Sequence, residues 1–252
     1  MILTIRSEWL KLRTVRVHFV LAIIALAFPL IVAVLASSFG SDPENVRTSE
    51  LAENIVGTAI ISVMLLGAIA AISLTSEFAH GTIRPTFAAT PNRVHVMAAK
   101  LFVNSVVAGI LTSGLVAVCW ALAAAIHNSR GADVSLSMDD GSVGVLTGLV
   151  ILAVIITWFA FGIGLIVRNS SATVTFLLLW PLVIENILSG VFSLLNVDGL
   201  TKWLPYRAGF EAAIFITPSE DALGRPGGLL WFGAVSAALV AFGLVVNVKR
   251  DA

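Results

Sequence analysis

Few residues in this chain have the type and position to do chemistry. Among its 30 Asp, Glu, Lys and Arg residues, Glu185 is the only one inside a set of long apolar runs, and Asn186 follows it directly. An ionisable side chain inside a membrane normally faces the protein interior or a cavity. Two interpretations follow, polar groups on a substrate pathway or a structural carboxyl that bonds to a neighbouring helix or holds the outer segment. Both stay open.

The remaining reactive side chains show no catalytic or cofactor-binding pattern. The four histidines (His18, His80, His95, His127) lack the spacing of a zinc site or of axial haem ligands, and Cys119 stands alone in an apolar run. The sequence also lacks a phosphate-binding Gly-x-x-x-x-Gly-Lys-Ser/Thr loop, a His-Glu-x-x-His motif and a Gly-x-Ser-x-Gly elbow. We therefore expect no catalytic residues, no metal and no bound cofactor.

The composition places these residues in a membrane protein. The chain has 252 residues, of which 58% are hydrophobic and only 12% are charged. A soluble domain carries about a quarter charged residues. The net charge is zero, so nothing indicates a basic surface for nucleic acid, and we expect no nucleic-acid partner.

Six apolar runs are long enough to cross a bilayer, which takes about 20 helical residues. The predicted spans cover residues 17–39, 55–76, 94–126 (its apolar part 101–126), 143–167, 172–195 and 229–248. The first run is too long for the core of a secretory signal, so we interpret it as a retained span. The expectation is an all-α integral membrane protein, with residues 1–252 forming a single transmembrane domain.

The cations predict the orientation. With the N-terminus inside, ten cations are cytoplasmic: Arg6, Lys11, Arg13, Arg16, Arg84, Arg93, Lys100, Arg168, Lys249 and Arg250. Five are outside: Arg47, Arg130, Lys202, Arg207 and Arg225. Cytoplasmic loops carry the excess of Lys and Arg, so both termini are predicted to be cytoplasmic.

The first 16 residues are predicted to form a helix lying in the membrane interface. Ile2, Ile5, Trp9 and Leu12 fall on one stripe, and Arg6 and Arg13 beside it add positive charge for anionic lipid. The alternative is a positively charged flank with no fold of its own.

The loop between spans two and three contains a short segment of its own. Thr90-Pro91 is a good helix start, which places the beginning of the third helix there. The preceding segment, 81–89, carries apolar residues that should face water: Ile83, Phe87, Ala88 and Ala89. An exposed apolar segment predicts a partner that covers it. The alternative is a loop that packs against its own bundle.

Two motifs resemble the permease subunits of ABC-2-type transporters. The first runs Glu77-x-x-x-Gly81-Thr82-Ile83-Arg84, then Ala89-Thr90-Pro91-x-Arg93, then Lys100; the second is Ser7-Glu8-Trp9-Leu10-Lys11-Leu12-Arg13. Six spans with both ends inside agree with this resemblance, which covers nearly the whole chain.

The resemblance implies specific roles for these residues. Residues 5–16 would be an interfacial elbow helix, with Ile5, Trp9, Lys11, Leu12 and Arg13 on it. Residues 81–89 would be the coupling helix that seats in a separate ATPase subunit, through Gly81, Thr82, Ile83, Arg84, Phe87, Ala88 and Ala89. Glu77 and Arg84 would frame that contact, and Arg93 and Lys100 would anchor the following helix. Pro85 requires the coupling helix to start near Arg84 or to be short.

The resemblance also implies partners and an outer structure. Two cytoplasmic ABC ATPase subunits would bind ATP and Mg, and a second permease copy or a homologous permease would complete the pathway. Short helices would dip into the outer leaflet between spans five and six, with Trp203 and Tyr206 at headgroup depth.

The predicted function is therefore a non-enzymatic permease subunit of an exporter in the cell membrane, with an amphipathic drug, antibiotic or lipid-like cargo. An ion-driven secondary transporter is the main alternative, but it would need several intramembrane charges or repeated halves. An intramembrane enzyme would need clustered Asp, His or Ser, which the spans lack.

Overall fold

The computed structural model describes residues 2–40, 47–90, 92–132, 134, 140–215 and 222–250, and every regular element in these ranges is helical. This confirms the prediction of an all-α chain. The helices are α1 (Ile2–Thr14), α2 (Arg16–Phe39), α3 (Thr48–Ala79), α4 (Ile83–Ala89), α5 (Arg93–Ser129), α6 (Asp140–Val167), α7 (Ser170–Leu179), α8 (Glu185–Leu194), α9 (Pro205–Ile214) and α10 (Gly224–Arg250). A π-helical turn, η2 (Trp180–Ile184), joins α7 to α8, and a 3₁₀ turn, η3 (Asp198–Trp203), precedes α9.

Six stretches are long and apolar enough to cross a membrane, as predicted. They are Arg16–Phe39, Thr48–Ala79, Arg93–Ser129, Gly141–Val167, Ser170–Leu194 and Gly224–Lys249. Most of the corresponding helices continue beyond the predicted apolar runs, because the polar turns that flank these runs are helical as well.

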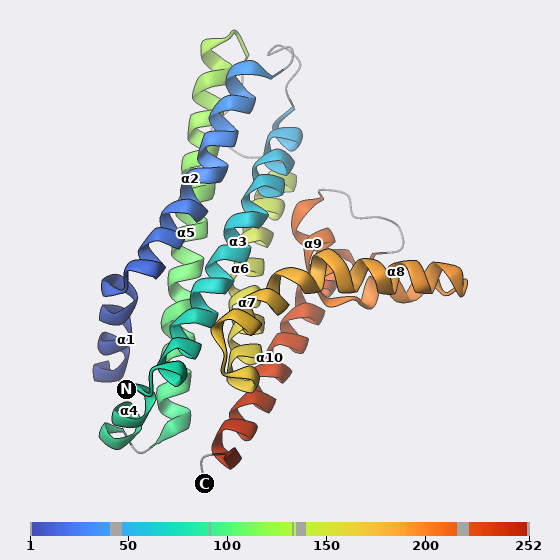
Figure 1. Cartoon of the computed structure of the whole chain (residues 1–252). Helices are drawn as coiled ribbons and strands as arrows, with labels where there is room; N and C mark the ends of the chain where they lie inside the picture. Colours follow the sequence, from blue (N-terminus) through green and yellow to red (C-terminus); the bar gives the residue numbers. More distant parts are fainter. Residues whose placement is uncertain are drawn as a thin grey trace.

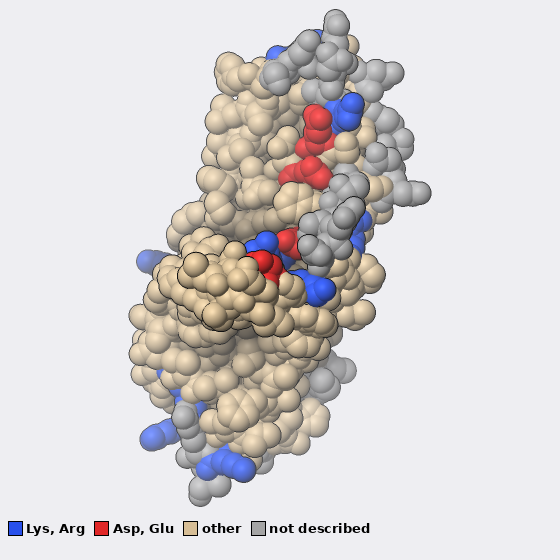
Figure 2. Space-filling model, turned by 90° about the vertical axis from the view of Figure 1, so that its right-hand side faces the viewer, with Lys and Arg blue, Asp and Glu red and all other residues tan. Residues whose placement is uncertain are grey.

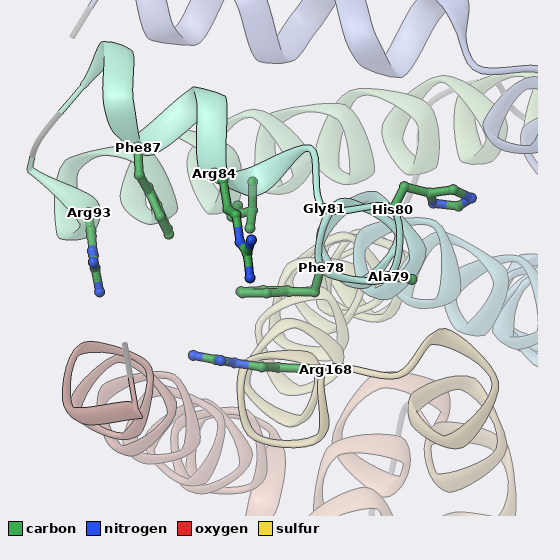
Figure 3. Close-up of a pocket in the computed structure, with 9 residues that line it drawn as sticks. Phe78, Ala79, His80, Gly81, Arg84, Phe87, Arg93 and Arg168 are labelled. Atoms are coloured by element: carbon green, nitrogen blue, oxygen red, sulfur yellow. The ribbon is translucent and has the colours of Figure 1, made fainter. Parts of the chain in front are cut away.

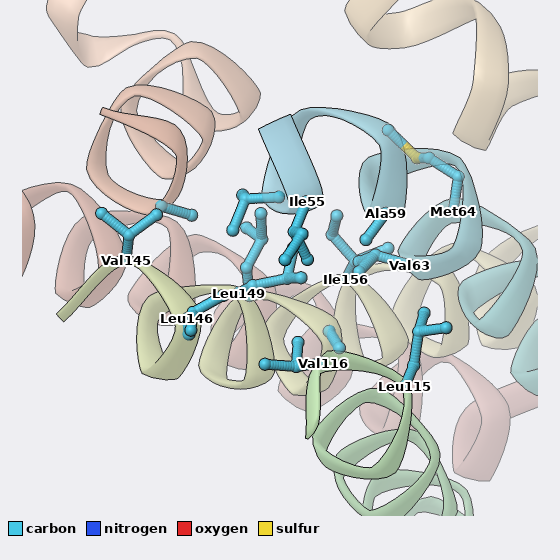
Figure 4. Close-up of a cluster of buried hydrophobic side chains, with 14 of the residues drawn as sticks. Ile55, Ala59, Val63, Met64, Leu115, Val116, Val145, Leu146, Leu149 and Ile156 are labelled. Carbon is cyan, nitrogen blue, oxygen red and sulfur yellow. The ribbon is translucent and has the colours of Figure 1, made fainter. Parts of the chain in front are cut away.

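The core lies between α3, α5 and α6 (Figure 4). Ile55 and Val63 of α3 meet Leu149 and Ile156 of α6, and Val116 of α5 closes one side. The α3 and α6 faces at this contact are buried in protein, whereas α2 shows much of its apolar surface to the outside. In a bilayer, lipid covers such a surface.

Glycines let α6 and α10 approach closely. A Cβ atom on Gly162 would lie 2.9 Å from the backbone of Leu239, and one on Gly243 would lie 2.7 Å from Cβ of Leu165. Small residues at such crossings allow the tight van der Waals packing that holds membrane helices together.

The fifth apolar run is not one straight helix. Pro181 has no N–H to donate and clashes with a regular turn, and the chain passes through η2 at this point. α8 then runs sideways from the bundle, at a height between its two ends (Figure 1). α7 alone has 10 residues and rises about 15 Å, roughly half the hydrocarbon thickness.

Both described ends of the chain lie at the same end of the bundle, together with α1 and α4 (Figure 1). On the face that Figure 2 shows, the charged side chains at this lower end are Lys and Arg, whereas Asp and Glu lie in the middle and upper parts. We refer to the end that holds α4 as the basic end.

The start of α5 differs from the prediction. The helix begins at Arg93, and the capping side chain is Asn92, whose Oδ1 accepts a hydrogen bond from the His95 N–H at 3.1 Å. Thr90 is instead the C-cap residue that follows α4, and Pro91 lies outside the described residues. Asn is as good a capping residue as Thr, and it stands closer to the first helical turn.

Candidate coupling site

α4 forms a short helical excursion at the basic end, between the end of α3 and the start of α5. Gly81 has φ +68°, a left-handed conformation that favours glycine and lets the chain reverse after α3. α4 then spans seven residues from Ile83, with Pro85 in its first turn, where proline is tolerated. The helix is therefore short, as Pro85 required.

One face of α4 packs against the bundle. Ile83 is only 6% exposed and lies in a small apolar cluster with Leu74, Met97, Phe161 and Leu165. Phe87, one helical turn later, packs against the same cluster. The prediction that Ile83 faces water is therefore wrong, because residues four apart share a helix face and this face turns inward. Arg84, Pro85 and Ala88 are exposed.

A cavity of about 960 Å³ opens beside α4 (Figure 3). Arginines from three segments line it: Arg84 of α4, Arg93 of α5 and Arg168 of the α6–α7 turn. The Arg93 guanidinium lies 5.2 Å from the centre of the Phe87 ring, and the Arg168 guanidinium lies 4.7 Å from that of Phe78. These cation–π contacts hold the guanidinium groups against the walls of the cavity.

Arg168 was not among the predicted site residues. It has φ +56°, and its guanidinium donates a hydrogen bond to Oδ1 of Asn247 at 3.0 Å. A bulky residue in the left-handed region is uncommon. The sequence signal was a lone arginine in a tight turn between two apolar runs.

Behind α4, four charged side chains, three of them buried, form a closed ring. We call Glu8, Lys11, Glu77 and Lys100 the charge ring. Lys11 Nζ donates to Oε1 of Glu8 at 2.7 Å and to Oε1 of Glu77 at 2.8 Å. Lys100 Nζ donates to Oε1 of Glu77 at 2.9 Å and also to Oε2 of Glu8. Each lysine thus contacts both glutamates, and the four charges cancel.

Three of the four side chains in the ring are deeply buried. The side chains of Lys100, Glu8 and Glu77 are 2%, 3% and 10% exposed, and Lys11 closes the ring on its outer side at 38%. Burial lowers the pKa of the Lys11 ammonium, but the neighbouring carboxylates of Glu77 and Glu8 outweigh it and raise the pKa above its ordinary value. Lys11 is therefore charged at neutral pH.

A second layer fixes the crossing of α3 and α5 beside the ring. Asn104 Nδ2 donates to Oγ of Ser73 at 3.2 Å and to the backbone oxygen of Lys100 at 2.8 Å. Lys100 Nζ also reaches the backbone oxygen of Ser73 at 3.3 Å. Buried polar groups that bond to one another in this way specify one arrangement of helices.

The ring gives Glu77 and Lys11 positions that the motifs did not indicate. Glu77 was predicted to frame a contact with a partner, yet its carboxylate points into the protein and pairs with lysines of α1 and α5. Glu8, which was not among the predicted site residues, is one of its most buried members. The two motifs behind the family resemblance therefore meet in space.

α1 is a helix, but it ends earlier than predicted. It stops at Thr14, so Arg16 belongs to α2. Leu12 packs against the apolar cluster of Leu66, Ile69 and Ala108, Ile5 is half-buried, and Trp9 and Arg13 are exposed.

At the opposite side of the bundle, Glu185 caps a helix. Its carboxylate oxygens accept hydrogen bonds from the backbone N–H groups of Tyr206 and Arg207, both at 2.8 Å, and from Nε1 of Trp180 at 3.0 Å. These N–H groups open α9, whose first turn would otherwise lack acceptors. Hydrogen bonds of this kind are what the structural interpretation of Glu185 predicts. Asn186 is exposed, and its side-chain amide donates to the backbone oxygens of Pro181 and Leu182.

The outer segment also corrects one aromatic position. Tyr206 was predicted at headgroup depth, but it is fully buried and packs edge-on against Phe159, with Phe232 nearby. Trp203 is exposed and contacts Trp231. Tyr206 lies inward because the capped start of α9 is held against the bundle by Glu185.

These features define a multi-pass membrane protein. A family model described as ABC-2 family transporter protein matches residues 4–194, which is most of the chain. The chain therefore belongs to the ABC-2 family and is a membrane permease, of a kind that lacks a catalytic ATPase domain. No curated protein and no solved structure was found to match it.

Proposed function

We propose that this permease is one subunit of an ATP-driven exporter and that a separate cytoplasmic ABC ATPase docks on α4. The proposal rests on the outward face of α4, where Arg84, Pro85 and Ala88 are exposed. On the opposite face, Ile83 and Phe87 pack against the bundle and hold the helix in place. A short helix that is fixed to the bundle on one side and exposed on the other suits a groove in a partner. Gly81 and Thr82 position it, and Ala89 ends it.

The orientation supports this docking. The basic end carries α1, α4, Arg168 and the C-terminal turn of α10 with Lys249, and an excess of Lys and Arg marks cytoplasmic loops. Both termini are then cytoplasmic, and α1 lies at the inner interface with Trp9 among the headgroups. α8, at the end of the fifth apolar run, forms the outer or re-entrant segment together with η3 and α9, before span six.

The other subunits of the proposed transporter are separate chains. ATP and Mg bind to the ATPase subunits, and a second permease copy or a homologous permease completes the pathway. The side chains of Leu182, Ile187 and Leu194 around α8 are exposed and apolar, which suits lipid or a second permease. An amphipathic cargo fits spans that hold so few charges. All six spans act as one domain.

Co-purification tests the docking. We expect the purified permease alone to hydrolyse no ATP and to bind a co-expressed ABC ATPase through α4. Ala88→Asp should reduce recovery of the ATPase, whereas Ala172→Asp, an exposed position in the first turn of α7 at the same end, should leave it unchanged. Equal recovery with both variants would place the docking surface elsewhere.

A further inference from the structure

We propose that Glu8 and Lys100 are positioning residues that join α1 to the two helices that carry α4, so that α1 and α4 move as one unit. This inference rests on the proposed docking for its purpose, but its physical content concerns this chain alone. Three observations support it: the closure of the charge ring, its place in the chain, and the limited attachment of α1 by other means.

The ring is hard to open while its charges remain. Each of the four members has two oppositely charged neighbours in the ring, so separating α1 from α3 and α5 would break two ion pairs, Lys11–Glu77 and Lys100–Glu8. Glu77 and Lys100 would keep each other as partners, but each would lose one of its two. The loss of a partner is unfavourable for a buried charge, so the ring opposes the separation of α1.

The ring lies at the base of α4. Glu77 is two residues before the end of α3, and Lys100 is in the second turn of α5. The ring therefore joins the two helix ends between which α4 lies, and we call these two helix ends the stems of α4. The bonds between Asn104 and Ser73 hold the same stems together. A displacement of α4 is thus passed to both stems at the level of the ring.

Besides the ring, α1 contacts the bundle through Leu12, which packs on Leu66, Ile69 and Ala108, whereas other apolar side chains of α1 are exposed. Its Leu3 and Leu10 side chains are 80% and 51% exposed, and a cavity of about 430 Å³ lies between Glu8 and Lys11 on one side and Thr82 and Thr86 on the other. Only Val15 separates α1 from α2. Motion that reaches α1 through the ring is therefore delivered directly to the first span.

A distance measurement between spin labels tests this tie without any ATPase. The labels are attached at Leu10→Cys and Ala88→Cys, both exposed positions, in a Cys119→Ala background in nanodiscs. We expect a narrow distance distribution with the ring intact. Glu8→Gln combined with Lys11→Met removes both ring charges of α1 and leaves the Lys100–Glu77 pair in place, so it should broaden the distribution. An unchanged narrow distribution would overturn the proposal.

Two controls keep the result interpretable. Lys100→Arg keeps the charge and should preserve the narrow distribution, and Arg13→Gln, on the exposed face of α1, should do the same. If the double variant fails to fold, Lys11→Met at the half-exposed edge of the ring takes its place, with the same expected broadening and the same overturning result.

Adding the ATPase and ATP separates this inference from the docking. For this measurement the label moves from Ala88, which lies on the proposed docking face, to Thr82→Cys, an exposed position just before α4. With the ring intact, the distance from Thr82 to a label at Val248 on α10 should change while the distance from Leu10 to Thr82 stays constant. A change in the Leu10–Thr82 distance would overturn the tie alone. A constant Thr82–Val248 distance would count against the proposed docking, and the nucleotide-free result would still decide the tie.

Discussion

Glu8 and Lys100, 92 positions apart in the chain, form a buried ion pair that joins α1 to α5. Together with Lys11 and Glu77 they make a neutral ring, so the effect of removing one member depends on whether the balance of charge is kept. This relationship gives the first prediction.

Lys100→Met should destabilise the permease by about 3–5 kcal/mol, because it leaves two buried carboxylates facing Lys11 alone. Adding Glu8→Gln restores the balance and should bring stability back to within about 1 kcal/mol of the parent. Unfolding in detergent measures both variants in a double-mutant cycle. Additive losses from the two substitutions would show that the ring is not a unit.

Glu185→Ala should loosen the start of α9 by about 2 kcal/mol, since two backbone N–H groups lose their acceptors. Hydrogen exchange over residues 205–214 measures the effect. Asn186→Ala is the matched control on the exposed neighbour and should change exchange little. Equal exchange in both variants would instead favour a pathway role for Glu185 over a capping role.

Gly162→Ala should separate α6 from α10 and cost about 1–3 kcal/mol, because the added Cβ meets the backbone of Leu239. Gly114→Ala is the control, as a Cβ there meets nothing within 4 Å. Thermal unfolding in detergent should show a lower midpoint for the first variant only. A lower midpoint for Gly114→Ala as well would mean that helix packing is not the cause.

The attachment of α1 should persist from neutral pH to about pH 10. The pKa of Lys11 is raised in the folded protein, so its ion pairs stabilise the fold fully below the ordinary lysine pKa of 10.5 and are lost only as the pH rises past the raised value. The mobility of a spin label at Leu10 reports the attachment, and Lys11→Met should remove its alkaline transition. A transition near neutral pH in the parent protein would contradict this assignment.

Hydrophobic runs predicted the spans well, because length and apolarity alone decide which segments are long enough to cross a bilayer. The break in the fifth apolar run at Pro181 was not predicted, because a count of apolar residues does not consider that proline interrupts a helix. Asn92 rather than Thr90 caps α5, a shift of two residues that capping preferences do not resolve.

The charge ring lay beyond sequence reasoning for a different reason. Glu8, Glu77 and Lys100 are far apart in the chain, and helix periodicity indicates only which residues share a face, not which helices meet. The sequence could not place Ile83 for the same reason. An apolar residue in a loop can contact a partner protein or pack against its own helix bundle. Only the packing of α4 on Phe161 and Leu165 distinguishes the two.

The central claim is that α4 meets a separate ATPase, and site-specific photo-cross-linking in living cells tests it most directly. A photoreactive amino acid at Ala88, on the exposed face of α4, should give an adduct with a protein that contains an ATP-binding cassette, and one at Leu194, at the end of α8, should not. Failure of the Ala88 probe to capture any such ATPase, in a permease that reaches the membrane intact, would contradict the account.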